Sequence, residues 1–266
     1  MPANPLYLCG TVDSVFDVAH ALAAEHCLPV WGSVLADSQR RGRGQMRREW
    51  SSPSGNIYAA LRLPLTQAFA SGAAALVMGA LLAEAFEQRD IRLFLKWPND
   101  LLLCPESGSG TLQAFPSGKA AGILLEERAG ALIAGIGINV ASAPSCAHIR
   151  EGGLTAACLN DLSHIDIRGR DALLDLWSCL VDSCIFCYRE WEKRGGNAWL
   201  ASTEQRLIWK GELVLLDNGE RRQGILLGLA ASGGLRLLCD GAEKEFLSGS
   251  LSPVVCHVYS KGCPSA

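Results

Sequence analysis

The chain has 266 residues, with 24 lysines and arginines against 27 aspartates and glutamates, so its formal net charge is -3. Hydrophobic residues make up 49% of it and charged residues 19%, a composition that predicts a folded globular protein and excludes disordered and collagen-like classes. An acidic chain has no overall electrostatic attraction to nucleic acid or to an anionic membrane, so any anion must be bound locally.

The targeting and cysteine patterns favour the cytoplasm. The start, MPANPLYLCG, lacks the basic and apolar segments of a signal peptide and carries no lipidation motif. The most apolar stretch, Ala68 to Phe86, is rich in Ala and Gly and contains Glu84, which favours a core helix over a membrane span. The 11 cysteines are an odd number scattered through apolar segments, which favours buried thiols over a disulfide framework.

The first part of the chain contains strands, helices and an expected hairpin, and a strand-rich end follows, so we expect an α+β fold. In chain order we expect a strand over 6–12, a helix over 14–26, a strand over 30–35, an irregular arginine segment over 40–48, a strand over 56–63, a helix over 68–86 and a strand over 91–97 that stops at Pro98.

Two apolar runs, over 119–128 and 131–140, are separated by a short Ala-Gly turn and predict an antiparallel hairpin. The Gly- and Ser-rich segment 105–118 before them predicts a loop excursion. Helices are expected over 153–160 and 171–193.

From Gly211 onward, short strands are divided by glycine turns, which predicts a small all-β module of barrel size. We therefore expect a catalytic domain over residues 1–205, a C-terminal β module over 206–258 and a tail over 259–266.

No metal ligand set is predicted. Cys184 and Cys187 form a CxxC motif, but they lie inside an expected helix with no second pair to complete a zinc site. The five histidines show no HExxH motif and no i, i+4 pairing.

The segment DSQRRGRGQMRREW, residues 37–50, places five arginines and two glycines in one stretch. Guanidinium groups are planar donor forks suited to phosphate and carboxylate, and glycine lets backbone amides approach the same ligand. This pattern favours a site for a small anion. A solvated basic loop and a nucleic-acid patch remain alternatives, the latter weakened by the lack of interleaved aromatic residues.

Three other stretches are candidates for binding chemistry. In KWPND (Lys96–Asp100) a strand ends in two short polar side chains, although taken alone this stretch is better explained by ordinary turn chemistry. Lys119 precedes a strand with Gly122 three residues on, which is either a point charge over a pocket or an exposed strand-end lysine. GIGIN (135–139) keeps glycines inside a buried strand, which indicates close approach of another backbone or of a ligand.

Phosphate-loop, nucleophile-elbow, kinase and dinucleotide motifs are absent from the sequence. An enzyme without such groups works by positioning and charge stabilisation, as adenylate-forming enzymes do.

Taken in order, DS, DSQRRGRGQMRREW, SPSGNIYAAL, KWPNDLL, GKAAGILLEE and GIGIN resemble the biotin protein ligase family, over residues 6–257. The resemblance implies a mixed sheet flanked by helices, the biotin/lipoate ligase fold, followed by a small SH3-like β-barrel. Members that also act as repressors carry an N-terminal winged helix-turn-helix; we expect none here before Leu6, and therefore no DNA partner.

The resemblance further implies ATP-dependent formation of biotinyl-5′-AMP, with Mg²⁺, and transfer of biotin to a lysine of a biotin carboxyl carrier protein. It assigns catalysis to Arg43 and Lys119, biotin binding to Ser14, Gln39, Gly42, Arg43, Gly44, Gln45, Lys119 and Gly122, and ATP binding to Arg48, Trp50, Lys96, Asn99, Asp100 and Asn139.

The sequence departs from the family at two places. Where the loop usually reads GRGRRGR, Gln45 replaces an arginine and Arg47 a glycine, so we expect faster leakage of the adenylate. Val15 and Phe16 replace a Thr-Asn pair that contributes to biotin binding. A lipoate or other acyl ligase of the same fold, and a non-catalytic biotin- or carrier-binding protein, remain alternatives. A homodimer also remains open, through strand edges expected beside GIGIN.

Overall fold

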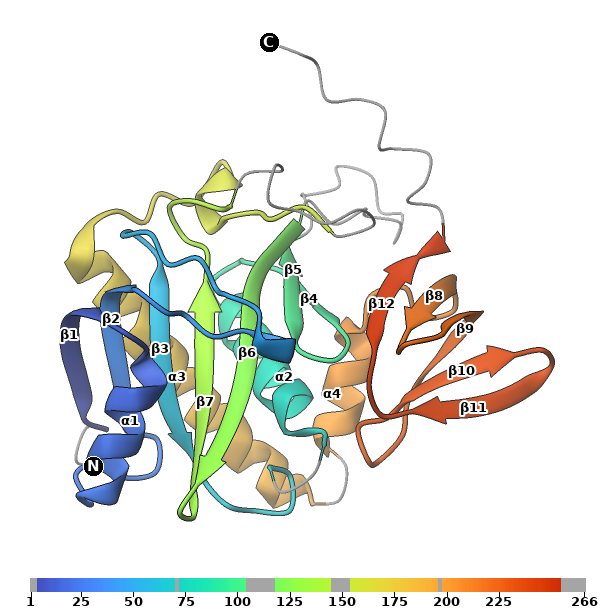
Figure 1. Cartoon of the computed structure of the whole chain (residues 1–266), viewed down its shortest axis with the longest axis horizontal. Coiled ribbons are helices and arrows are strands. Elements are labelled where there is room, and N and C mark those ends of the chain that lie inside the picture. The colour runs from blue at the N-terminus through green and yellow to red at the C-terminus, as the bar shows by residue number, and fades with distance from the viewer. Residues whose placement is uncertain (1–3, 70–71, 104–117, 145–153, 196–197, 255–266) are drawn as a thin grey trace, which may run out of the picture.

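A seven-stranded mixed sheet forms the centre of the molecule, which confirms the expected mixed sheet (Figure 1). The computed structural model describes residues 4–69, 72–103, 118–144, 154–195 and 198–254. The strands over residues 6–12 and 33–39, at one edge of the sheet, pair in parallel, and every other neighbouring pair is antiparallel. In spatial order the strands are β1 (Leu6–Val12), β2 (Ser33–Gln39), β3 (Ile57–Leu63), β7 (Ala131–Ile138), β6 (Gly118–Arg128), β5 (Asp100–Leu103) and β4 (Leu93–Lys96).

Helices cover both faces of this sheet. On one face, α2 (Ala74–Glu87) and α3 (Gly169–Arg194) build the main core, and α4 (Ala198–Arg206) packs against α2 (Figure 1). On the other face, α1 (Val15–Ala24) packs on β2, β3 and β7. Among the described residues, no helix therefore covers β6 on this second face.

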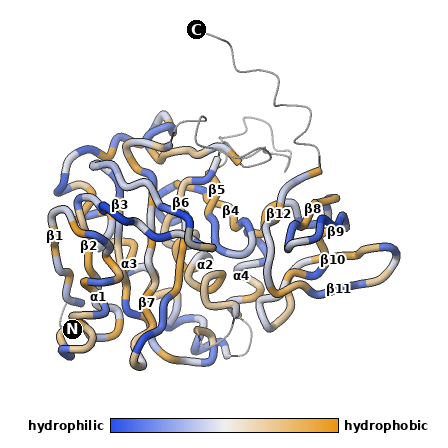
Figure 2. Tube along the Cα trace, in the orientation of Figure 1, coloured by the Kyte–Doolittle hydropathy of each residue, from blue (hydrophilic) through white to orange (hydrophobic). Residues whose placement is uncertain are grey.

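The expected core helix is confirmed as α2, which begins six residues later than expected, at Ala74. It is apolar along its length (Figure 2), and 11 of its 14 residues are buried. Among the described residues, none of the helices combines the length and the apolarity needed to cross a bilayer.

The β6–β7 hairpin is confirmed, and its turn chemistry explains it. Ala129 and Gly130 have φ of 48° and 74°, and two positive φ values in a two-residue loop match the right-handed twist of the flanking strands. The prediction that GIGIN borders a free sheet edge is wrong, because β7 lies between β3 and β6.

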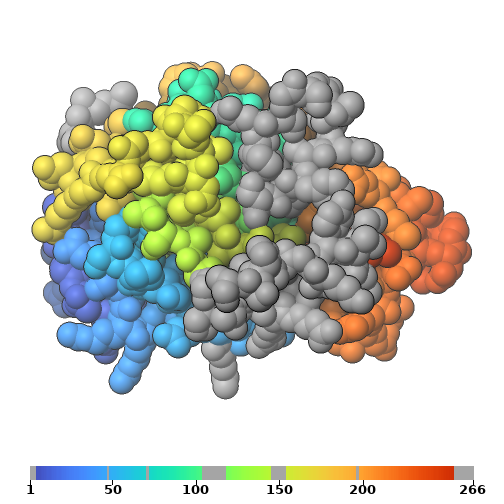
Figure 3. Space-filling model, turned by 90° about the horizontal axis from the view of Figure 1, so that it is seen from above, coloured from blue at the N-terminus to red at the C-terminus, as the bar shows by residue number. Residues whose placement is uncertain are grey.

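A second, five-stranded antiparallel sheet follows. Its order is β11 (Ala242–Phe246), β10 (Leu235–Cys239), β9 (Arg221–Leu229), β8 (Leu213–Asp217) and β12 (Ser250–Pro253). Figure 3 shows this sheet at one end of the molecule and the N-terminal strands at the other. Trp97 links the two sheets, because its buried indole donates to the Gly233 carbonyl over 3.0 Å.

Besides shifted bounds, several elements differ in kind from the sequence-based expectations. The helix expected over 153–160 is wrong for its described part, which contains an isolated β-bridge from Ala156 to Lys119 and the start of a 3₁₀ turn at Leu159–Asp161. Strands β5 and β12 and helix α4 were not predicted. The loop excursion falls almost entirely, and the tail wholly, outside the described residues.

Candidate functional site

A cleft lies on the α1 side of the sheet, between the loop of residues 42–50 and strands β6 and β7, with a cavity volume of about 190 Å³. The loop crosses the sheet in front of β3 and β7 and reaches β6 (Figure 1). Segments far apart in the sequence meet here. The predicted site residues that line the cleft are Gln39, Arg43, Gly44, Gln45, Arg48, Trp50, Lys96, Asn99, Asp100, Lys119 and Gly122.

A β-bulge in β6 brings Lys119 to the cleft. Leu101 of β5 pairs with Ala121, but Leu102 pairs with Lys119, so β6 carries one extra residue, Ala120. In a regular strand Lys119 and Gly122, three residues apart, would face opposite sides of the sheet. With the bulge they share a face: a Cβ added at Gly122 would lie 3.0 Å from the Lys119 Nζ.

Asp100 holds two lysine side chains at this end of the cleft. Its Oδ1 lies 2.6 Å from the Nζ of Lys119, and its Oδ2 accepts a hydrogen bond from the Nζ of Lys96 over 3.3 Å. Burial alone would raise the pKa of Asp100, but the two ammonium groups outweigh it and lower that pKa. Two positive groups against one carboxylate leave a surplus positive charge here.

Trp50, at the end of the loop, packs onto the glycines of the two central strands. A Cβ at Gly137 would lie 2.6 Å from the Trp50 Nε1, and one at Gly122 would lie 2.7 Å from the ring. The glycines in the buried strand do allow a close approach, as expected, but the approaching group is an indole side chain and not a backbone or a ligand. The Lys119 Nζ lies 4.9 Å from the centroid of the Trp50 ring, within cation–π range.

The indole N–H of Trp50 is buried and finds no acceptor among the described residues. Buried donors of this kind are rare in folded proteins. The Trp50 N–H is therefore a polar group that the cleft leaves available.

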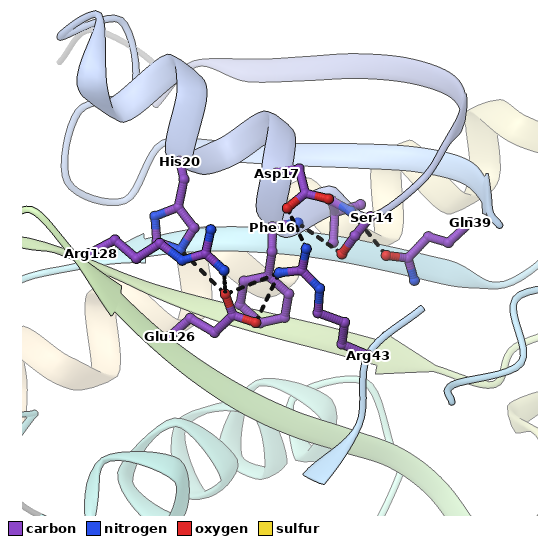
Figure 4. A network of polar contacts seen from close by, with 9 residues as sticks. Ser14, Phe16, Asp17, His20, Gln39, Arg43, Glu126 and Arg128 are labelled. Carbon is purple, nitrogen blue, oxygen red and sulfur yellow. Dashed lines mark hydrogen bonds and ion pairs between the residues drawn. The ribbon is translucent and has the colours of Figure 1, made fainter. Parts of the chain in front are cut away.

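Arg43 lies at the opposite end of the cleft, in a network of charged groups (Figure 4). Its Nη1 donates to both carboxylate oxygens of Glu126 over 3.1 Å, and its Nη2 donates to Asp17 Oδ1. Arg128 also donates to Glu126, over 2.7 Å. Two guanidinium groups meet two carboxylates, so this end carries no surplus charge.

Two of the predicted biotin-binding side chains are engaged in local structure. Ser14 is the N-cap of α1, and its buried hydroxyl accepts from the Phe16 amide over 3.4 Å. Gln39 accepts from the Val15 amide over 3.0 Å and donates to Ser52 over 3.1 Å. Gln39 lines the cleft and Ser14 does not.

Gly42 and Asn139 also lie outside the cleft lining. The carbonyl of Gly42 accepts from the Trp50 amide over 2.9 Å, which closes the neck of the loop. The buried Asn139 amide donates to the carbonyls of Lys119 and Ala157, each over 3.2 Å, so it ties β6 to the segment after β7. Their assignment to biotin and ATP stays a prediction.

Asn99 both lines the cleft and is engaged in local structure. It lines the cleft, yet its amide donates to the Ile123 carbonyl over 2.7 Å and fixes the β4–β5 turn against β6. The turn interpretation of KWPND is therefore confirmed, and its binding role stays a prediction that its place in the cleft lining permits.

The described residues offer no resident metal site. No group of three or more His, Cys, Asp or Glu in the described ranges is placed to hold a metal ion. Asp100, the carboxylate beside the lysines, is already engaged by both of them.

The chain matches the model of the biotin/lipoate A/B protein ligase family over residues 28–142. It is 31% identical to the biotin–acetyl-CoA-carboxylase ligase of Paracoccus denitrificans, over 77% of this chain and 82% of that protein. The chain belongs to the biotin protein ligase family. It is also 28% identical to the bifunctional ligase/repressor BirA of Escherichia coli, over 83% of this chain and 65% of that protein.

Among solved structures of the family, the biotin protein ligase of Aquifex aeolicus in complex with biotin and ATP superimposes with a TM-score of 0.72. It is 26% identical, and the match covers 93% of this chain and 97% of that one.

Several residues of the cleft and of the charged network around Arg43 were missed from the sequence of this biotin protein ligase family member. Glu126, which pairs with Arg43, could have been found, because it alternates with Gly122 and Leu124 along β6. Asp17 lies one helical turn after Ser14, but nothing in the sequence connects it to Arg43. Ser250 enters the cleft lining from β12, a strand that the sequence did not reveal.

Proposed function

We propose that this protein is an ATP-dependent biotin protein ligase. Family membership supports the reaction class. The observation that carries the proposal is the cleft itself, where Lys119 is fixed by Asp100 over Gly122 and beside Trp50, beneath an arginine-rich loop. Such a site offers a fixed cation and an apolar floor to a carboxylic acid whose carboxylate must approach the α-phosphate of ATP.

In the proposed first step, a biotin carboxylate oxygen attacks the α-phosphorus of ATP. The bond to the bridging oxygen of the β-phosphate breaks, and pyrophosphate leaves with the electron pair. Two anions must approach, so a positive group between them lowers the barrier. We assign this task to Lys119, because the surplus positive charge of the described cleft lies at Lys119, Lys96 and Asp100.

In the proposed second step, a lysine amine of a biotin carboxyl carrier protein attacks the acyl carbon of biotinyl-5′-AMP. The bond to the phosphate oxygen breaks, AMP leaves, and the amine loses a proton as the amide forms. The mixed anhydride survives only where water is excluded. We propose that the loop of residues 42–50 provides this cover, with Gly42, Gly44 and Gln45 contributing backbone contacts.

Arg43 also belongs to the proposed site, at its edge. Three contacts with carboxylates occupy part of its guanidinium, which has five N–H donors, and the remaining donors are available to the ligand. We propose Ser14, Gln39 and Gly122 for biotin, and Arg48, Trp50, Lys96, Asn99, Asp100 and Asn139 for ATP. Mg²⁺ would be bound to the phosphates of ATP and would enter the cleft as part of the substrate.

We further propose that the chain divides near residue 205 and that its C-terminal sheet is an SH3-like module that closes the phosphate end of the cleft. Gly249 and Ser250 support this placement, because they line the cleft together with Lys96. A cytoplasmic location, a homodimer and the lack of a DNA partner stay predictions.

Exchange of radiolabelled pyrophosphate into ATP tests the function. The proposal requires exchange that depends on biotin. Exchange with lipoate instead would indicate another acyl ligase of the same fold. No exchange with either acid would indicate a non-catalytic binding protein, and both of these results contradict the proposal.

A further inference from the structure

The charged network around Arg43 joins three parts of the chain that are distant in sequence. Arg43 comes from the loop, Asp17 and His20 from α1, and Glu126 and Arg128 from β6 (Figure 4). The side chains of Arg43 and Glu126 are 32% and 19% exposed, so solvent screens this pair less than a surface pair.

Arg43 is also the point where the loop is closed by its own backbone. It forms a β-bridge with Glu49, and the Gly44 amide donates to the Arg48 carbonyl over 2.8 Å. The Trp50 amide donates to the Gly42 carbonyl over 2.9 Å. Fixing the Arg43 side chain therefore also fixes the neck of the loop and the backbone position of Trp50.

The surface beneath Arg43 is rigid. Its guanidinium lies 5.8 Å from the centroid of the Phe16 ring, and Phe16 packs so closely on Gly135 that a Cβ there would overlap the ring. Phe16 is 2% exposed. The guanidinium thus rests on a buried ring and is held from two sides by carboxylates.

We propose that Asp17 and Glu126 are positioning residues, which hold the Arg43 guanidinium and thereby fix the base of the loop of residues 42–50 over the cleft. Held in this way, the loop keeps Trp50 on Gly137 and retains the adenylate. The effect on adenylate retention rests on the proposed function, whereas the effect on the loop does not.

Limited proteolysis tests the effect on the loop without any ligand. The loop contains several trypsin sites, and Asp17→Asn combined with Glu126→Gln removes both anchoring charges at little change of volume. Loss of these charge-assisted bonds should speed cleavage after Arg48 about tenfold. Asp17→Asn alone, at a half-exposed site, should give a smaller increase in the same direction if the double variant does not fold.

The matched control is Asp13→Asn. Asp13 pairs with Arg40 over 3.4 Å at the start of the same segment, but both side chains are at least half exposed and neither lines the cleft. Its cleavage rate after Arg48 should stay within about twofold of wild type. Cleavage of the double variant at the wild-type rate, or more slowly, overturns the proposal.

Ligand retention gives the second measurement. In the double variant the release rate of biotinyl-5′-AMP and the KM for biotin should rise about tenfold, while kcat of exchange changes less than about threefold. Tighter biotin binding would instead show that the carboxylates compete with the ligand for Arg43, and it overturns the proposal. If wild type shows no exchange, the proposed function fails while the proteolysis result still decides the anchoring role.

Discussion

The Nζ of Lys119 lies 2.6 Å from the Oδ1 of Asp100 and 4.9 Å from the centroid of the Trp50 ring. A carboxylate and an indole therefore fix one ammonium group over a glycine. An ammonium held in this way needs little reorganisation when charge develops beside it, which is the condition for electrostatic catalysis.

Lys119→Ala should lower the rate of biotin-dependent pyrophosphate exchange by about 10²- to 10³-fold, because it removes the proposed charge-stabilising group. The fold should persist, since the side chain is partly exposed and Lys96 still pairs with Asp100. Exchange assays and circular dichroism measure the two effects. Lys244→Ala, at an exposed position of β11, is the matched control and should behave as wild type. Full activity of Lys119→Ala would refute the assigned role.

Gly137→Ala should displace Trp50 from the floor of the cleft, because the new Cβ would lie 2.6 Å from the indole Nε1. We expect the KM for ATP or biotin to rise about tenfold or more, as overpacking costs about 1–3 kcal/mol. The control is Gly10→Ala in β1, where a Cβ meets no atom within 4 Å. Equal kinetics in the two variants would contradict the placement of Trp50.

Gln45→Arg should slow the release of biotinyl-5′-AMP severalfold, since it returns a positive charge to the cleft lining. Arg47→Gly should act in the same direction by restoring flexibility to the loop. Stopped filtration of the enzyme–adenylate complex measures both rates. If neither substitution slows release, the loop departures do not cause leakage.

Asn139→Ala should lower both stability and the affinity for ATP. The Asn139 amide donates to two carbonyls in the interior, and leaving them unpaired costs about 1–3 kcal/mol. A lower urea midpoint together with a higher KM for ATP is the expected result. A lower urea midpoint with an unchanged KM for ATP would contradict the proposed nucleotide role of Asn139.

As the pH decreases below about 6.5, the free energy of unfolding should decrease because of His20. Burial, followed by the charge of Arg128, lowers the pKa of His20 below 6.5, although Glu126 and Asp17 oppose this. The unfolded chain therefore binds the proton more readily, and the free energy of unfolding decreases as pH falls from 6.5 toward the lowered folded pKa. Urea midpoints at about pH 7.5 and 5.5 should differ more in wild type than in His20→Gln. Equal differences would show that His20 does not cause the loss.

Local patterns predicted most of the sheet. Strand β1 matches its expected bounds, and the β6–β7 hairpin follows from two apolar runs around an Ala-Gly turn. The cleft was predictable to the extent that its residues lie in spaced motifs, since KWPND, Lys119 and the arginine segment do meet.

The remaining features depend on contacts between distant segments. Strand β4 ends before Pro98 as expected, but the sequence did not reveal that the chain turns back there into β5, a turn that Asn99 holds by donating to the Ile123 carbonyl. The pairing of Arg43 with Glu126 spans 83 positions and has no local signature. A bulge is equally invisible to strand periodicity.

The bulge at Ala120 lowers the regularity of strand pairing, and the proposed activity depends on it. Ala120 and Ala121 are both part of the core on the α2 side, so the strand gives up regular pairing to place two consecutive alanines there and to turn the preceding side chain, Lys119, toward the cleft. A chain with a straight β6 would keep its sheet and improve its ladder, but it would drive the Lys119 ammonium into an apolar layer. Selection for stability alone would therefore remove the irregularity on which the proposed chemistry of Lys119 depends.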